Sequence, residues 1–82
     1  MKPIRITRHA RNRMRWHGID DRLVERAVRA SEREDASASG RINAWIEVKN
    51  RFLRVTYRDE ADQIVVISAV FKRKLSRRRG ER

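Results

Sequence analysis

The spacing of apolar residues changes once along this chain, and the change limits the folds that it can adopt. Up to residue 31 apolar side chains recur at helical intervals, and the clearest set is Leu23, Val24, Ala27 and Val28. From residue 42 they alternate with polar side chains, which is the period of a strand with one buried face. Helices followed by strands predict an α+β domain.

Two helices are expected in the first part of the chain. Thr7 is placed to cap a helix over residues 8–17, and Gly18 suits the left-handed residue that ends a helix. Asp20 is then placed to cap a second helix over residues 21–31. Each helix can bury one apolar stripe against a neighbouring layer.

Three strands are expected after the polar segment 31–40, which we interpret as a loop. Residues 42–48 and 52–58 alternate and are joined by a tight turn, whereas residues 63–71 are apolar on both faces, as in a strand inside a sheet. Short turns make neighbouring strands antiparallel. The predicted fold is therefore two N-terminal helices packed on a three-stranded antiparallel sheet, with residues 4–6 as a short extended entry.

The length of 82 residues allows one domain, which we expect over residues 1–73, followed by a basic, flexible tail over residues 74–82. The chain has no cysteine, which is compatible with a reducing compartment. Its longest apolar run, residues 64–71, is too short for a bilayer, which takes roughly 20 residues. Without an apolar N-terminal stretch to act as a signal, a cytoplasmic location is expected.

Positive charge is concentrated at the two ends of the chain. The formal net charge is +11, residues 1–18 carry six Lys and Arg without an acid, and residues 71–82 carry seven against one. Clusters of this kind attract polyanions, of which RNA or DNA is the usual one. The alternative is a solubilising surface with a basic tail.

The first predicted helix carries the residues of greatest chemical interest. At about 100° per residue, Ala10 and Met14 fall on a core-facing stripe. Three arginines lie opposite, in solvent: Arg8, Arg11 and Arg15. The border beside the stripe holds His9, Arg13 and Trp16.

Two interpretations of Arg13 remain open at this stage, namely an ion pair with an acid of the second helix (Asp20, Asp21 or Glu25) and a contact to a phosphate. Two also remain open for His9. The positive helix end and the nearby arginines disfavour a charged imidazole, so His9 can serve as a general base, or it can bond the backbone at the helix start.

The sheet adds candidate nucleic-acid contacts. A face with arginines, hydroxyls and one large aromatic can hold phosphates and stack a base, although an ordinary solvated face gives the same pattern. The candidate binding residues are Arg41, Trp45, Arg58, Lys72, Arg73 and Lys74. No metal site or cofactor is expected, because His9 and His17 are two helical turns apart and no cysteine is present.

The segment "ITRHARNRMRWHGI" resembles the opening signature of a small domain-of-unknown-function family, H-A-x-x-R-M-x-x-R-G-I. The matching positions are His9, Ala10, Arg13, Met14, Gly18 and Ile19, and His17 stands where the pattern has its second arginine. "LRVTY" and "IVVISAVF" resemble the strands of this family, and "VISAVFKRK" also resembles the last strand of BrnT-type toxins. The resemblance covers roughly residues 4–73.

The family is similar to the RelE and BrnT class of ribonuclease toxins, which cut RNA without a metal and pair with an antitoxin. The resemblance implies a RelE/BrnT-like fold and a site formed by His9, Arg13 and Arg54. His9 would be the base that activates the 2′-hydroxyl of RNA, and the arginines would stabilise charge on phosphorus. The general acid stays open between Tyr57, Lys72 and His17.

Two functions are therefore expected to compete. One is a toxin-like, metal-independent endoribonuclease that acts on RNA and is neutralised by an acidic antitoxin protein. The other is a non-catalytic RNA- or DNA-binding module.

Overall fold

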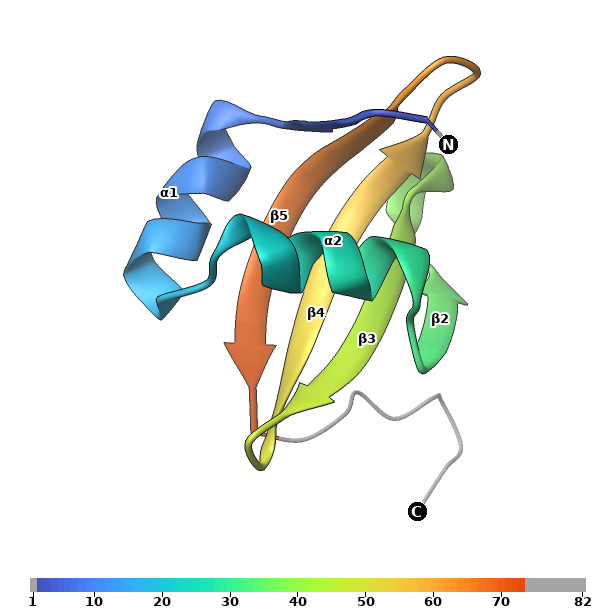
Figure 1. Ribbon diagram of the computed structural model, residues 1–82. Coiled ribbons are helices and arrows are strands. Elements are labelled where there is room, and N and C mark those ends of the chain that lie inside the picture. The colour runs from blue at the N-terminus through green and yellow to red at the C-terminus, as the bar shows by residue number, and fades with distance from the viewer. Residues whose placement is uncertain (1, 74–82) are drawn as a thin grey trace.

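The computed structural model describes residues 2–73. Along the chain the elements are β1 (Ile4–Ile6), α1 (Arg8–His17), α2 (Asp21–Arg29), β2 (Arg33–Ala36), a 3-10 turn (Ala38–Gly40), β3 (Ile42–Val48), β4 (Arg51–Asp59) and β5 (Ile64–Lys72). Helix α2 crosses one face of the sheet and α1 lies beside β5 (Figure 1). The α+β class predicted from the period change is confirmed.

The prediction of a three-stranded antiparallel sheet was wrong. The sheet has five strands in the order β1-β5-β4-β3-β2, and β1 runs parallel to β5 while the other pairs are antiparallel. The segment 31–40, expected to be a loop, contributes β2, which pairs with β3 from Arg33↔Trp45 to Ala36↔Ile42. Both added strands are short edge strands. Residues 4–6 are extended as expected, but their pairing with β5 was not predicted, and residues 33–36 lack the alternating apolar residues by which a strand is recognised.

Both helix starts and the end of α1 follow the predicted capping residues, whereas α2 ends at Arg29 and not at the predicted residue 31. The Thr7 side chain accepts a hydrogen bond from the backbone N–H of Ala10, and Gly18 ends α1 at φ 68° in the left-handed region. Asp20 accepts from the N–H of Leu23 at 3.0 Å and so begins α2. These caps satisfy backbone groups that would otherwise lack partners, which is why the sequence locates both helix starts correctly.

Loss of the Asp20 cap gives a first prediction. Asp20→Ala is expected to lower the free energy of unfolding by about 1 kcal/mol, because an N–H in the first turn of α2 loses its acceptor. Urea unfolding would measure the change. Asp20→Asn is the matched control, since it keeps an acceptor oxygen, and an equally large loss in that variant would contradict the capping explanation.

The hydrophobic core lies between the helices and one face of the sheet. Ala10 and Met14 of α1 and Val24 and Ala27 of α2 are buried there against Leu53 and other sheet residues. Successive side chains of a strand point to opposite sides of the sheet. Every second strand residue therefore points away from the core, toward the side that we call the open face. Among the described residues, no helix has the length and apolar character needed to cross a membrane.

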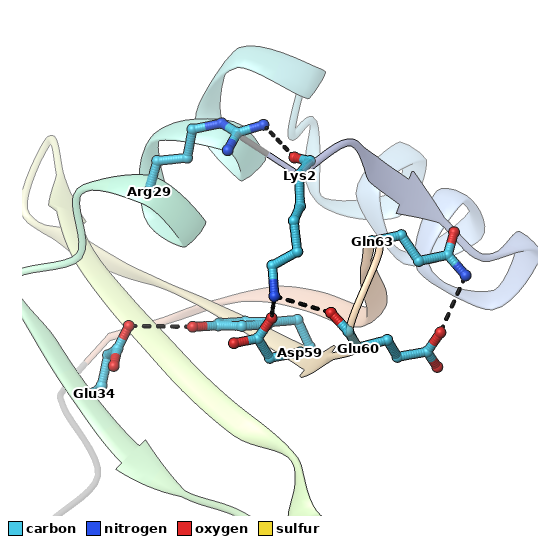
Figure 2. Close-up of polar contacts among 7 residues, drawn as sticks. Lys2, Arg29, Glu34, Asp59, Glu60 and Gln63 are labelled. Atoms are coloured by element: carbon cyan, nitrogen blue, oxygen red, sulfur yellow. Dashed lines mark hydrogen bonds and ion pairs between the residues drawn. The ribbon is translucent and has the colours of Figure 1, made fainter.

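The start of the chain is fastened to the β4–β5 turn (Figure 2). Lys2 pairs with Asp59, and its Nζ donates to the backbone oxygen of Glu60 at 2.9 Å. Arg29, at the end of α2, donates to the backbone oxygen of Lys2 at 3.0 Å. These contacts hold β1 in place beside β5, and the chain enters α1 directly from β1.

Candidate nucleic-acid interface

Helix α1 presents a continuous exposed surface of basic and polar side chains. We call it the α1 face, and its members, all exposed, are Arg8, His9, Asn12, Arg13, Arg15 and Trp16. The helix contains four arginines, two histidines and no acidic residue. Because its buried side is formed by Ala10 and Met14, the fold fixes which side of α1 faces solvent.

The ion pair between the helices is made by Arg11 rather than by Arg13. Its guanidinium donates to both carboxylate oxygens of Asp21, at 2.6 and 3.0 Å. The hydrogen bond from Arg11 lowers the pKa of Asp21 below its ordinary value. Arg13, predicted to lie at the border of the core, is exposed, and no ion pair or hydrogen bond holds it within residues 2–73. The interhelical interpretation of Arg13 was therefore wrong.

The structure leaves His9 exposed at the start of α1, one turn before Arg13. Within the described part of the chain, its side chain makes no hydrogen bond that would lock the helix start, since Thr7 does this instead. His9 and Arg13 are thus close neighbours on one surface and are available to a ligand.

Arg54, the third predicted catalytic residue, lies in a different layer. It is on β4 and pairs with Trp45 of β3 and Val70 of β5 across the open face. No hydrogen bond, ion pair or cation–π contact joins Arg54 to His9 or Arg13 within residues 2–73. The structure therefore brings two of the three predicted catalytic residues together, and leaves Arg54 apart from them.

On the open face, the indole of Trp45 is held in a polar network. Its Nε1 donates to Asp35 at 3.0 Å, and the same carboxylate accepts from Asn43 at 3.0 Å. Thr56 then donates to the Asn43 side-chain oxygen at 2.7 Å. The Arg54 guanidinium carbon lies 6.0 Å from the centre of the Trp45 ring, within the range of a cation–π contact.

This network changes the role expected of Trp45. The side chain is only 1% exposed, so a base has no access to its ring, although the register places it on the predicted face. Trp45 packs and orients its neighbours rather than offering a stacking surface. The Nε of Arg54 is buried beside it and lacks a hydrogen-bond partner among the described residues.

The remaining predicted contacts are spread over several elements. Arg41 lines a hollow together with Glu34 and Asp35, whose negative charge disfavours a phosphate there. Arg58 donates to Glu60 at 2.9 Å. Lys72 and Arg73 are exposed at the end of β5, and Lys74 lies outside the described residues, as does the predicted tail.

Tyr57 is unsuited to be the general acid. It is 6% exposed on the core side of the sheet, and its hydroxyl donates to Glu34 at 3.2 Å. Burial, together with the negative charge of Glu34, raises the pKa of Tyr57 to about 12. The acid then stays open between Lys72, at the end of β5, and the half-buried His17.

Titration of Tyr57 gives a second prediction. Tyr57 is the only tyrosine of the chain, so phenolate absorbance reports this group alone. The pKa is raised in the folded state from 10.0 to about 12, so the stability contributed by Tyr57 is complete below pH 10 and declines as the pH rises toward 12. Tyr57→Phe should remove that part of the alkaline decline, and phenolate formation near pH 10 in folded protein would contradict the burial of Tyr57 and its contact with Glu34.

A family model described as Domain of unknown function (DUF4258) matches residues 6–71. The chain belongs to this family. No curated protein and no solved structure matches the chain. The predicted resemblance to a small family of unknown function is thereby confirmed, whereas the relation to RelE and BrnT toxins stays a prediction.

Two members of the α1 face of this DUF4258 domain were not predicted from the sequence. Trp16 was placed at the border of the core, yet it is 85% exposed, and Asn12 was given no role. Their spacing of four residues on an amphipathic helix was the available signal, since such pairs lie one above the other. Groups of three or more His, Asp or Glu able to hold a metal do not occur among residues 2–73.

Proposed function

We propose that this DUF4258 protein binds RNA through the α1 face. The observation that carries the proposal is the charge of α1: four arginines and no acid, with only Arg11 neutralised by a neighbouring carboxylate within residues 2–73. Exposed cations that the fold does not use remain free to neutralise phosphates. The high net charge of the chain, +11, adds long-range attraction for a polyanion.

A second candidate function, metal-independent cleavage of RNA, is favoured by the position of His9. The imidazole is exposed one helical turn from Arg13 on the same surface. In this reaction His9 takes the proton of a 2′-hydroxyl, the freed oxygen attacks the adjacent phosphorus, and Arg13 stabilises the extra negative charge. The bond to the 5′-oxygen breaks as that oxygen receives a proton, and Lys72, His17 or water is the source.

A toxin-like role would follow from the second candidate. The resemblance of the family to RelE and BrnT-type ribonucleases supports it, and a basic α1 face of this kind would suit an acidic antitoxin protein as partner. Binding of such a partner would compete with RNA, because both would use the same cations.

The experiment that separates the two functions is incubation of RNA with the pure protein in the presence of EDTA. Cleavage that survives the chelator and is lost in His9→Ala would establish the ribonuclease. RNA that is bound but remains intact would leave the binding function alone. Arg22→Ala, which removes an exposed arginine of α2, is the matched control and should behave as the wild type does.

Arg13→Ala provides the third prediction. Because Arg13 is exposed and unpaired within the described residues, its loss should change the free energy of unfolding by less than about 0.5 kcal/mol. RNA affinity should nevertheless fall, since one phosphate contact is lost. Thermal melting and filter binding on the same samples would measure both effects, and a strongly destabilised Arg13→Ala protein would return Arg13 to a structural role.

A further inference from the structure

Trp16 is exposed in a way that the fold does not explain. Its side chain is 85% exposed, whereas the other large apolar side chains of residues 2–73 are buried or half-buried. An indole contributes most when its ring is covered, and its N–H then finds a partner. An uncovered tryptophan in the middle of a charged surface indicates a ligand that covers it.

The residues around Trp16 form an open surface pocket. Trp16, Asn12 and Arg15 line an open hollow of about 470 Å³. Asn12 precedes Trp16 by four residues, so its amide lies beside the indole one turn along the helix. A flat ring with polar edges suits this arrangement, because the indole offers a stacking face and the amide offers both a donor and an acceptor.

Positively charged side chains flank this pocket on both sides. At about 100° per residue, Asn12 and Trp16 lie at the centre of the exposed arc of α1. Arg8 and Arg15 fall on one side of that centre, and His9 and Arg13 fall on the other. A ring stacked on Trp16 would thus have positive charge on either side, where the phosphates of a continuous strand would lie.

From this arrangement we infer that Trp16 and Asn12 form a binding site for an unpaired nucleobase, so that the α1 face takes single-stranded RNA in preference to duplex RNA. The inference rests on the proposed function and adds the class of RNA. In a duplex the base faces are already stacked, whereas unpaired bases are free to stack on aromatic side chains.

A protein partner fits this surface less well. An amphipathic helix that docks into a protein groove presents several apolar anchors at intervals of three, four and seven residues. On the α1 face Trp16 is the one apolar side chain, and its neighbours at these intervals are His9, Asn12 and Arg13. A single aromatic residue among cations is instead typical of single-strand binding.

The test uses the fluorescence of the two tryptophans. An unpaired oligonucleotide should quench the wild-type signal as a base stacks on Trp16, while a hairpin duplex of equal length should quench it little. Trp45 is 1% exposed and serves as an internal reference. In Trp16→Phe, affinity for the single strand should stay near wild type and the quenching should disappear, because phenylalanine still stacks.

Trp16→Ala should weaken binding of the single strand by about 5- to 150-fold and leave binding of the duplex unchanged. Equal affinity of the wild type for both RNAs, with no effect of Trp16→Ala, would overturn the base-binding site and leave the proposed function standing. Wild-type protein that binds neither RNA would overturn both. Self-association that Trp16→Ala abolishes while RNA binding persists would show Trp16 to be a protein contact and would also overturn the inference.

Discussion

Trp45→Ala is expected to be the most destabilising single substitution on the open face. Removal of a fully buried tryptophan costs about 3–5 kcal/mol, and a small domain has roughly 5–15 kcal/mol in total. Trp45 is 1% exposed, and the loss would extend to Asp35, which gives up the hydrogen bond from the indole nitrogen, and to Arg54, which gives up the ring beneath it. Chemical denaturation followed by circular dichroism would measure the change.

Trp45→Phe separates packing from hydrogen bonding at this position. It keeps most of the buried surface and loses the donor to Asp35, so the expected cost is smaller, about 1–2 kcal/mol. Asp35 still accepts from Asn43 in this variant. If Trp45→Ala proved as stable as the wild type, the buried placement of Trp45 on the open face would be wrong.

The parts of the fold that local chemistry determines were predictable from the sequence. Thr7, Gly18 and Asp20 each act within one turn of their own position, and the helix starts and the left-handed end are where the sequence placed them. The same holds for the hairpin between β3 and β4, where Lys49 and Asn50 both adopt positive φ, as a two-residue turn requires.

The edges of the sheet were not predictable from the same signals. Three of the four residues 33–36 are charged, and an edge strand needs only one neighbour and gains from charged side chains that discourage further pairing. Residues 4–6 pair in parallel with Ile64–Val66, about 60 positions away in the sequence. Because no short turn connects the two strands, the sequence carries no local signal for this pairing. A hydropathy pattern detects strands that have a buried face. The two edge strands β1 and β2 form largely because they pair with β5 and β3, and hydropathy does not reveal such pairing.

For the candidate site, helical spacing predicted which side of α1 is exposed, but the sequence did not predict which arginine contacts α2 or how deeply Trp45 is buried. The wheel correctly separated Ala10 and Met14 from the exposed side, but it favoured Arg13 rather than Arg11 as a possible partner for an acid of the neighbouring helix. Which arginine reaches Asp21 depends on how α2 is placed beside α1, and a single-helix projection lacks that information. The alternation of residues along the strand likewise predicted the face of the sheet on which Trp45 lies, but not that Trp45 is buried there.

Neutralising the α1 face is expected to have the largest effect on nucleic-acid binding. The triple variant Arg8→Gln/Arg13→Gln/Arg15→Gln removes the three arginines of α1 that have no carboxylate partner within residues 2–73. Each phosphate contact contributes about 0.7 to the slope of log affinity against log salt for a single strand, so the slope should fall by about 2. Binding at several salt concentrations would measure it.

A control of equal charge decides whether position or total charge matters. Arg22→Gln/Arg26→Gln/Lys49→Gln also removes three exposed cations, from α2 and the β3–β4 turn, and so reduces long-range attraction to the same extent. If the α1 face contacts phosphates, the control should keep a slope close to that of the wild type while the α1 variant loses about 2. Equal losses of slope in the two variants would mean that RNA affinity depends on net charge alone. The α1 face would then not be the binding site.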